Sequence, residues 1–196
     1  MLSWNVRGAN DVNKRRIIKS VVRKQKVDLF CIQETKIQLM TDGVVKSLGV
    51  GRFLDWRTIE AVVAAGGVLI CWDKRSLELL EWEEGQFSIS CKFRTVENGV
   101  VWVFTGVYGP FTKEDRECLW DEFGAIRGLW GEPWCVGGDF NVILSLRGKK
   151  QAREDYISYE EVCSGYGWPW AYWPSPSRWL FYVEWGASKS SLSQVG

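Results

Sequence analysis

The 196-residue sequence contains no histidine. Imidazole is the commonest general base in enzymes and a frequent ligand of zinc and copper. This chain therefore has no imidazole for either role. Six cysteines are present, but no two have the Cys-x-x-Cys spacing of a zinc or redox motif. Any mechanism that needs imidazole as a base or a ligand must therefore do without it.

The cysteines are scattered, and four of them lie inside apolar runs: Cys31, Cys71, Cys91 and Cys135. This arrangement is typical of small buried side chains in a reducing compartment and not of a disulfide framework. The sequence also lacks an apolar stretch of membrane-spanning length and a signal-peptide pattern. We therefore expect an intracellular protein with no membrane partner.

The net charge of +1 singles out no class of partner. Short basic runs at 14–16 and 147–150 are more often solvated faces than phosphate contacts, and we interpret them in that way. With 46% apolar and 25% charged residues the chain has the composition of a globular protein. Its length fits one domain with a sizeable core.

Hydrophobic periodicity predicts a mixture of strands and helices. The expected strands are 2–6, 28–33, 52–58, 67–73, 77–84, 86–94 and 100–108, and the expected helices are 12–26, 36–48 (interrupted near Gly43) and 112–129. Asp11 or Asn13 is the expected N-cap of the first helix, and Asn98-Gly99 predicts a hairpin turn. The inner face of the last helix is expected to be Leu119, Trp120, Phe123 and Ile126.

The segment from Trp134 to Ile143 combines a short apolar strand with two glycines, Asp139 and Asn141. In extended chain, a spacing of two puts Asp139 and Asn141 on one side and turns Phe140 into the core. The glycines indicate close approach of a backbone or a ligand. A carboxylate beside a carboxamide suits a divalent metal, a phosphate or an activated water. Taken alone, the segment is explained more simply as a turn stabilised by the asparagine.

Four predicted strands end in polar side chains, namely Asn5, Glu34, Tyr108, and Asp139 with Asn141. If the strands lie side by side, these ends form one rim that holds two carboxylates, two amides and a phenol. Such a rim offers oxygen ligands without sulfur or imidazole, which favours Mg²⁺ or Mn²⁺ over zinc. Each residue alone is explained as a turn or a cap, but together they predict a site.

Four motifs, in matching order and spacing, resemble those of the endonuclease/exonuclease/phosphatase superfamily. They are Ser-Trp-Asn-Val-Arg-Gly (3–8), Ile-Gln-Glu-Thr-Lys (32–36), Gly-Val-Tyr-Gly-Pro (106–110) and Gly-Gly-Asp-Phe-Asn-Val-Ile (137–143). Over roughly residues 1–150 their wording is most similar to the N-terminal endonuclease domain of plant non-LTR (LINE-type) retrotransposon polyproteins. The resemblance implies an α/β (α+β) four-layer sandwich. Two mostly antiparallel sheets would lie face to face between helices, incomplete at the C-terminus.

The resemblance also implies Mg²⁺-dependent (or Mn²⁺-dependent) hydrolysis of phosphodiesters, with DNA as partner and the nucleus as the place of action. Glu34 would be the metal ligand, with Asn5 in the same metal and phosphate shell. Tyr108 would contact the scissile phosphate. Asp139 would orient or deprotonate the attacking water, and Asn141 would hold the phosphate and its transition state.

Two parts of the family pattern have no counterpart in this sequence. One is an aspartate in a Ser-Arg-Leu-Asp-Arg-like segment, and the other is a C-terminal Ser-Asp-His motif whose histidine is a general base or charge stabiliser. The absence of histidine makes the second loss certain for this chain. Because removal of one member of a catalytic set costs orders of magnitude in rate, we expect weak or no activity.

The C-terminal part has neither helical nor strand periodicity after about residue 158. We assign 1–153 to a partial domain and 154–196 to a poorly ordered, Trp-rich tail, with five of the 13 tryptophans from Trp168 to Trp185. A one-nucleotide frame shift in Gly-rich coding sequence creates tryptophan codons, so we hypothesise a frame-shifted remnant. A base-stacking aromatic platform is less favoured, because lysine and arginine are sparse there.

Two other interpretations of the whole chain stay open. One is a non-catalytic, decayed retrotransposon fragment whose unpaired strand edges favour aggregation. The other is a different branch of the superfamily, such as an abasic-site nuclease or a phosphoinositide or sphingomyelin phosphodiesterase.

Overall fold

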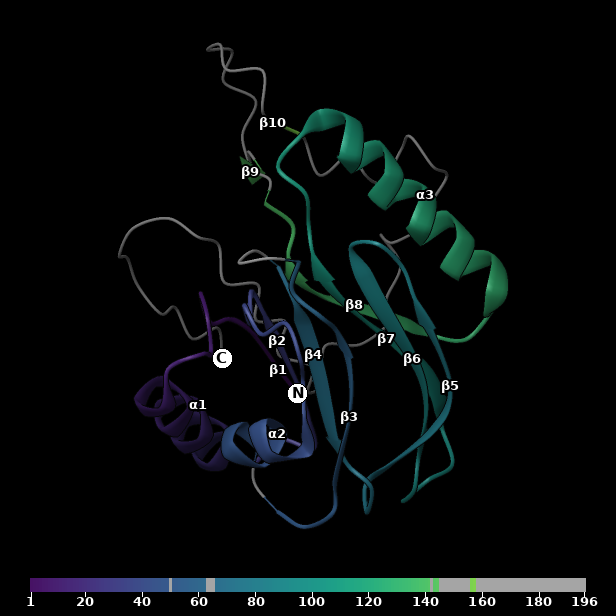
Figure 1. Cartoon of the computed structure of the whole chain (residues 1–196). Helices are drawn as coiled ribbons and strands as arrows, with labels where there is room; N and C mark the ends of the chain where they lie inside the picture. Colours follow the sequence, from purple (N-terminus) through teal and green to yellow (C-terminus); the bar gives the residue numbers. More distant parts are fainter. Residues whose placement is uncertain (50, 63–65, 142, 145–155, 158–196) are drawn as a thin grey trace.

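The computed structural model describes residues 1–49, 51–62, 66–141, 143–144 and 156–157 (Figure 1). In chain order its elements are β1 (Leu2–Asn5), α1 (Val12–Gln25), β2 (Leu29–Gln33), α2 (Asp42–Leu48), β3 (Leu54–Ile59), β4 (Val68–Asp73), β5 (Leu77–Glu84), β6 (Ser88–Thr95), β7 (Val101–Tyr108), α3 (Lys113–Leu129), β8 (Trp134–Asp139), β9 (Ile143–Leu144) and β10 (Tyr156–Ile157). The predicted tail lies outside the described residues apart from β10, as does the basic run 147–150.

The strands form two four-stranded sheets, with orders β1-β2-β4-β3 and β5-β6-β7-β8, and β9 and β10 form a separate parallel pair. In the first sheet β2 and β3 are each antiparallel to β4, while β1 is parallel to β2. In the second sheet β6 is antiparallel to β5 and β7, while β8 is parallel to β7. The prediction of two mostly antiparallel sheets is confirmed.

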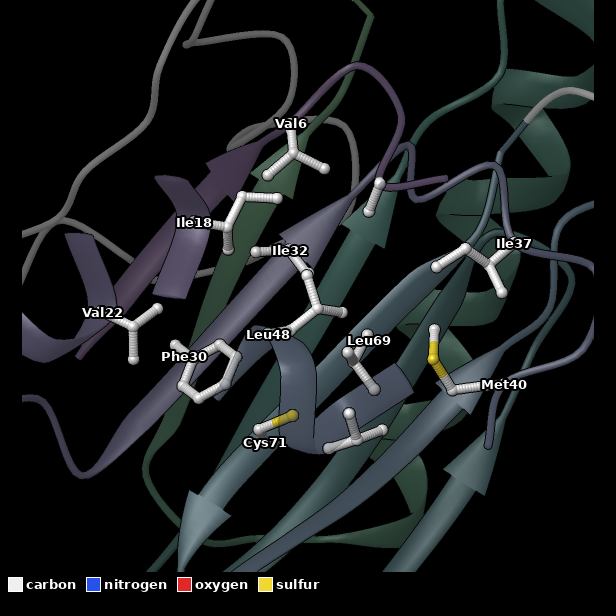
Figure 2. Close-up of a cluster of buried hydrophobic side chains, with 12 residues drawn as sticks. Val6, Ile18, Val22, Phe30, Ile32, Ile37, Met40, Leu48, Leu69 and Cys71 are labelled. Atoms are coloured by element: carbon white, nitrogen blue, oxygen red, sulfur yellow. The ribbon is translucent and has the colours of Figure 1, made fainter. Parts of the chain in front are cut away.

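Helices cover the outer face of each sheet, which completes four layers (Figure 1). Figure 2 shows Ile18 of α1 and Leu48 of α2 packed with Phe30 and Ile32 of β2. On the second sheet, Phe123 of α3 belongs to a separate buried cluster under that helix. The predicted four-layer α/β sandwich is therefore the observed fold.

A third buried cluster fills the space between the sheets. It joins Cys31 of β2 and Ile70 of β4 to Phe93 of β6 and Phe104 of β7. Because successive side chains of a strand point to opposite faces, β2 sends alternate residues to the helices and to the facing sheet. All residues of Leu29–Gln33 are buried for this reason, and the first four of them form a continuous apolar run in the sequence.

The predicted helix 36–48 is wrong over its first half. α2 begins only at Asp42, with Thr41 as its N-cap. Lys36 has a φ of 57°, and its backbone N–H donates to the Gly66 carbonyl oxygen at 3.1 Å. The left-handed backbone at Lys36 excludes a helix there. The Met40 N–H, the first that such a helix would need, donates to Glu60 Oε1 at 3.0 Å, and the Ile37 carbonyl oxygen accepts the N–H of Ala61 at 3.0 Å.

No range was predicted for β9 or β10, and β8 is longer than expected. Apart from α2, the remaining elements match the predicted ranges to within two residues at either end. Asp11 is the N-cap of α1 and accepts a hydrogen bond from the N–H of Lys14 at 2.8 Å. Gly99 has a φ of 71°, as a tight hairpin turn requires. Among the described residues, no helix is long and apolar enough to cross a bilayer.

Three of the four cysteines in apolar runs, Cys31, Cys71 and Cys91, are buried as the sequence predicts, while Cys135 is only half-buried. The described cysteines carry free thiols, and Cys118 is exposed. Burial raises the pKa of the Cys31 and Cys91 thiols to about 12. A thiol that stays protonated at neutral pH is a poor nucleophile and a poor metal ligand.

One carboxylate fastens α3 to the turn between β5 and β6. Glu122 Oε1 accepts the backbone N–H groups of Gln86 at 2.7 Å and Phe87 at 3.1 Å, and its Oε2 accepts the Ser88 hydroxyl at 2.7 Å. The Phe87 carbonyl oxygen in turn accepts the N–H of Tyr108 at 3.0 Å. Glu122 therefore holds the turn against which the end of β7 is bonded.

We expect Glu122→Ala to lower the free energy of unfolding by about 2 kcal/mol, because it leaves several donors without their charged acceptor. Urea unfolding followed by circular dichroism measures the change. The matched control is Glu117→Ala on the exposed face of the same helix, which makes the same change in helix propensity. Equal effects of the two substitutions would show that the Glu122 contacts contribute nothing.

Candidate active site

The parallel pairings bring four strand ends to one rim of the sandwich. In the first sheet Asn5 pairs in register with Gln33, and in the second sheet Tyr108 pairs with Asp139. β1 and β8 also pack against each other across the two sheets. Glu34 follows Gln33 directly, so the predicted convergence of polar side chains occurs.

A hydrogen bond between side chains joins the two sheets at this rim. Asn5 Nδ2 donates to Asp139 Oδ2 at 2.6 Å, although the two residues are 134 positions apart in the chain. Asn5 Oδ1 accepts the N–H of Arg7 at 2.9 Å, and Asp139 Oδ1 accepts the N–H of Asn141 at 2.9 Å. Both side chains are therefore oriented by the backbone that follows their strands.

Asn141 reaches the rim by a different route from the one predicted. β8 ends at Asp139, and Asn141 has a φ of 50°, so the extended geometry expected for the pair is wrong. A turn brings the two together instead. Asn141 Nδ2 donates to the Gly109 carbonyl oxygen at 2.5 Å, and the Gly109 N–H donates to the Asp139 carbonyl oxygen at 2.6 Å. Phe140 does point inward as predicted, and its ring centroid is 6.3 Å from that of Phe123 under α3.

Glu34 occupies a left-handed backbone conformation with a φ of 53°, which is uncommon for a residue with a side chain. Its carbonyl oxygen accepts the N–H of Gly8 at 2.6 Å, which ties the loop after β2 to the loop after β1. Glu34 Oε1 lies 2.9 Å from Lys36 Nζ, and the side chains are 17% and 36% exposed, respectively. Sequence reasoning gave Lys36 no role, and only its spacing of two from Glu34 pointed to this ion pair.

The phenol of Tyr108 is electrostatically coupled to both carboxylates. Burial is the main cause that raises its pKa above 10.0, and the negative charges of Glu34 and Asp139 raise it further, while a hydrogen bond with Asn141 opposes them. Gly66 lies against the ring, since a Cβ there would be 3.7 Å from Tyr108 Cδ1. The phenol therefore stays protonated, and a hydrogen-bond donor, at neutral pH.

The model of the endonuclease/exonuclease/phosphatase family matches residues 2–183. The chain belongs to this family. The match extends into the region that we assigned to the tail. A comparison with curated proteins found no similar sequence.

Solved structures share the fold at low sequence identity. A family member from Bacteroides thetaiotaomicron has 16% identity and a TM-score of 0.58, covering 72% of this chain and 63% of its own. A mannosyl-6-phosphatase from the same bacterium has 15% identity and a TM-score of 0.59, covering 84% of this chain and 70% of its own. An AP endonuclease from Leishmania major has 15% identity and a TM-score of 0.51, covering 71% of this chain and 54% of its own. This chain thus spans less than two thirds of the first and third of these proteins.

The donor atoms of the rim fit a divalent metal of the kind that the family typically uses. The rim offers the carboxylates of Glu34 and Asp139 and the amide oxygens of Asn5 and Asn141, all of them hard oxygen ligands. Within the described ranges, no group of three or more histidine, cysteine, aspartate or glutamate side chains is placed to hold a metal. Mg²⁺ needs no such cage, because it is usually held by one or two carboxylates with waters and substrate phosphates.

We expect Asp139→Asn and Glu34→Gln each to lower the pKa of Tyr108 toward its ordinary value of 10.0, because each removes a negative charge that disfavours the phenolate. NMR of protein labelled at tyrosine ¹³Cζ measures the titration, and Tyr108→Phe assigns the resonance. Glu97→Gln, at the opposite end of β7, is the control. An unchanged or higher pKa in both variants would contradict the coupling.

We also expect Lys36→Met to tighten Mn²⁺ binding about two- to fivefold. The Lys36 ammonium competes for Glu34, and a partly exposed ion pair of this kind contributes roughly 0.2–1 kcal/mol. Titration by electron paramagnetic resonance measures free Mn²⁺ independently of any activity. Lys24→Met on α1 makes the same change in net charge away from the rim. If both lysine variants bind alike, or if Glu34→Gln binds as well as the wild type, Glu34 is not the ligand.

Proposed function

We propose that this chain is a phosphodiester hydrolase of the endonuclease type, with DNA as substrate and Mg²⁺ or Mn²⁺ as cofactor. The observation that carries the proposal is the 2.6 Å hydrogen bond from Asn5 to Asp139, which joins strand ends of the two sheets at one rim. Family membership supports phosphoester hydrolysis. The similarity of the four motif sequences to those of retrotransposon endonucleases supports DNA as substrate and the nucleus as the place of action.

Asp139 is the group proposed to act on the attacking water. Its two oxygens accept hydrogen bonds from Asn5 Nδ2 and from the Asn141 N–H, which fix the plane of the carboxylate. A carboxylate held in this way has lone pairs left to orient a water and to receive its proton. Fixed orientation matters because a misplaced base loses most of its effect.

The amides and the phenol are proposed to hold the phosphate. Asn141 is turned to the rim by its left-handed backbone, and Tyr108 keeps its hydroxyl proton because its pKa is raised. Neutral donors preorganised around a phosphoryl group stabilise the charge that grows on its oxygens in the transition state. Glu34 and Asn5 would hold the metal, which, when bound, neutralises charge on the phosphoryl oxygens.

The rate is proposed to be low for a physical reason. No histidine is present in the chain to protonate a leaving oxygen or to stabilise the charge opposite the metal. A positioned acid or base typically contributes about 10²- to 10⁴-fold to a rate. What is left in the chain supports binding of the phosphate and activation of water, but not the full reaction rate.

The test is nicking of supercoiled plasmid DNA with Mg²⁺. We expect slow nicking by the wild type that chelation abolishes and that Glu34→Gln and Asp139→Asn each reduce by roughly 10²-fold. Glu97→Gln should nick at the wild-type rate. Equal nicking by all variants would refute the assignment of the site. No nicking at all would favour the non-catalytic fragment, and fast nicking would show that histidine is dispensable.

A phosphomonoesterase is the second candidate, because the fold is also shared with a mannosyl-6-phosphatase at a TM-score of 0.59. Hydrolysis of p-nitrophenyl phosphate and of bis(p-nitrophenyl) phosphate separates the two activities in one assay. Diester hydrolysis that depends on Asp139 supports our proposal. Hydrolysis of the monoester alone would contradict our proposal and favour a phosphomonoesterase.

A further inference from the structure

An exposed aromatic ring stands beside the candidate site. Phe111 is 69% exposed, and its ring centroid lies 6.3 Å from that of Tyr108 with the planes at 81°. Tyr108 is the residue coupled to both Glu34 and Asp139. Phe111 therefore contacts the ring of Tyr108, one of the residues proposed to hold the scissile phosphate.

The start of α3 explains why the ring is exposed. Phe111 directly precedes Thr112, the N-cap of α3, and an apolar residue at this position usually packs on the fourth helical residue. Here the fourth helical residue is Arg116, which is 8% exposed, and its Nη1 donates to the Phe111 carbonyl oxygen at 3.4 Å. The arginine holds the backbone of Phe111 in place of the usual apolar contact with the ring.

The loop that carries Phe111 is braced on its other side as well. Gly109 is bonded through its N–H to Asp139 and through its carbonyl oxygen to the Asn141 side chain. Phe111 is two residues further along, so its position is tied to the same atoms that form the site. A backbone held in this way reduces the conformational entropy lost when the side chain it carries contacts a ligand.

Cationic side chains lie on the other side of the rim. Arg7 is exposed in the loop after β1, Lys14 Nζ donates to the Arg7 carbonyl oxygen at 2.9 Å, and Lys36 is partly exposed beside Glu34. Cations on one side and an aromatic face on the other match a nucleotide chain, whose phosphates and bases need those two kinds of contact.

We propose that Phe111 stacks on an unpaired nucleobase next to the scissile phosphate. This inference rests on the proposed function and makes its substrate more specific, namely a nucleic acid strand whose base at that position is unstacked. Every nucleobase has a π-face, so the contact favours unpaired bases without reading their sequence. A phosphate carried on a sugar alone would gain nothing from Phe111.

The experiment compares two oligonucleotides of equal length and charge by fluorescence anisotropy, with Ca²⁺ in place of Mg²⁺ to prevent hydrolysis. One is a labelled thymidine oligonucleotide, and the other carries base-free tetrahydrofuran residues. We expect Phe111→Ala to weaken binding of the thymidine strand by about tenfold and to leave binding of the base-free strand unchanged. Phe111→Trp should bind the thymidine strand at least as tightly as the wild type.

The control is Leu129→Ala, which removes another exposed apolar side chain at the far end of α3 and should change neither affinity. Equal losses on both strands in Phe111→Ala, or no loss on either, would overturn the inference. So would equal binding of the two strands by the wild type. A base-dependent loss together with failure of plasmid nicking would refute hydrolysis and keep the stacking contact. Nicking that depends on Glu34 and Asp139 without a base-dependent loss would support hydrolysis and refute the stacking contact.

Discussion

The hydrogen bond between Asn5 and Asp139 is the contact on which the site depends. It joins the end of the first strand of one sheet to the end of the last strand of the other, at 2.6 Å. This meeting is possible because β1 and β8 each run parallel to their neighbour, so that β1, β2, β7 and β8 all finish at the same rim. An antiparallel β8 would carry Asp139 to the opposite end of the sandwich.

The core below the rim keeps the two sheets close enough for this contact. A Cβ at Gly137 would lie 3.5 Å from that of Ser3, so β8 passes directly over β1. Gln33 is 1% exposed in this region, and its Nε2 donates to the Ser3 hydroxyl at 2.9 Å. A buried amide is tolerated only when it is hydrogen-bonded, so Gln33 and Ser3 stabilise the positions of β1 and β2 relative to each other. This register positions Asn5, the last residue of β1, and Glu34, the residue that follows β2.

Sequence reasoning succeeded where the determining interactions are local. Strand periodicity, the N-cap at Asp11 and the turn at Asn98-Gly99 depend on a few neighbouring residues, and the structure bears them out. The meeting of the polar strand ends was also predictable, because parallel neighbours in a sheet finish at one edge. The roles of these residues stay predictions.

The errors concern backbone conformations that distant partners impose. Lys36 is left-handed and bonds through its N–H to Gly66, and Asn141 is left-handed and bonds through its side chain to Gly109; a local pattern reveals neither partner. The positions of Lys36 against Glu34 and of Phe111 against Tyr108 depend on side-chain directions in the folded chain. The division at residue 153 and the frame-shift hypothesis stay predictions.

The central claim is that Asn5 and Asp139 interact directly across the two sheets. A double-mutant cycle with Asn5→Ala, Asp139→Ala and the double variant, measured as free energies of unfolding, tests it most directly. We expect a coupling energy of about 1–2 kcal/mol, the contribution of a hydrogen bond to a charged acceptor. Each single substitution removes this bond, so the sum of the two single effects counts its loss twice, whereas the double variant loses it once. Additivity of the two single effects to within about 0.3 kcal/mol would contradict the account.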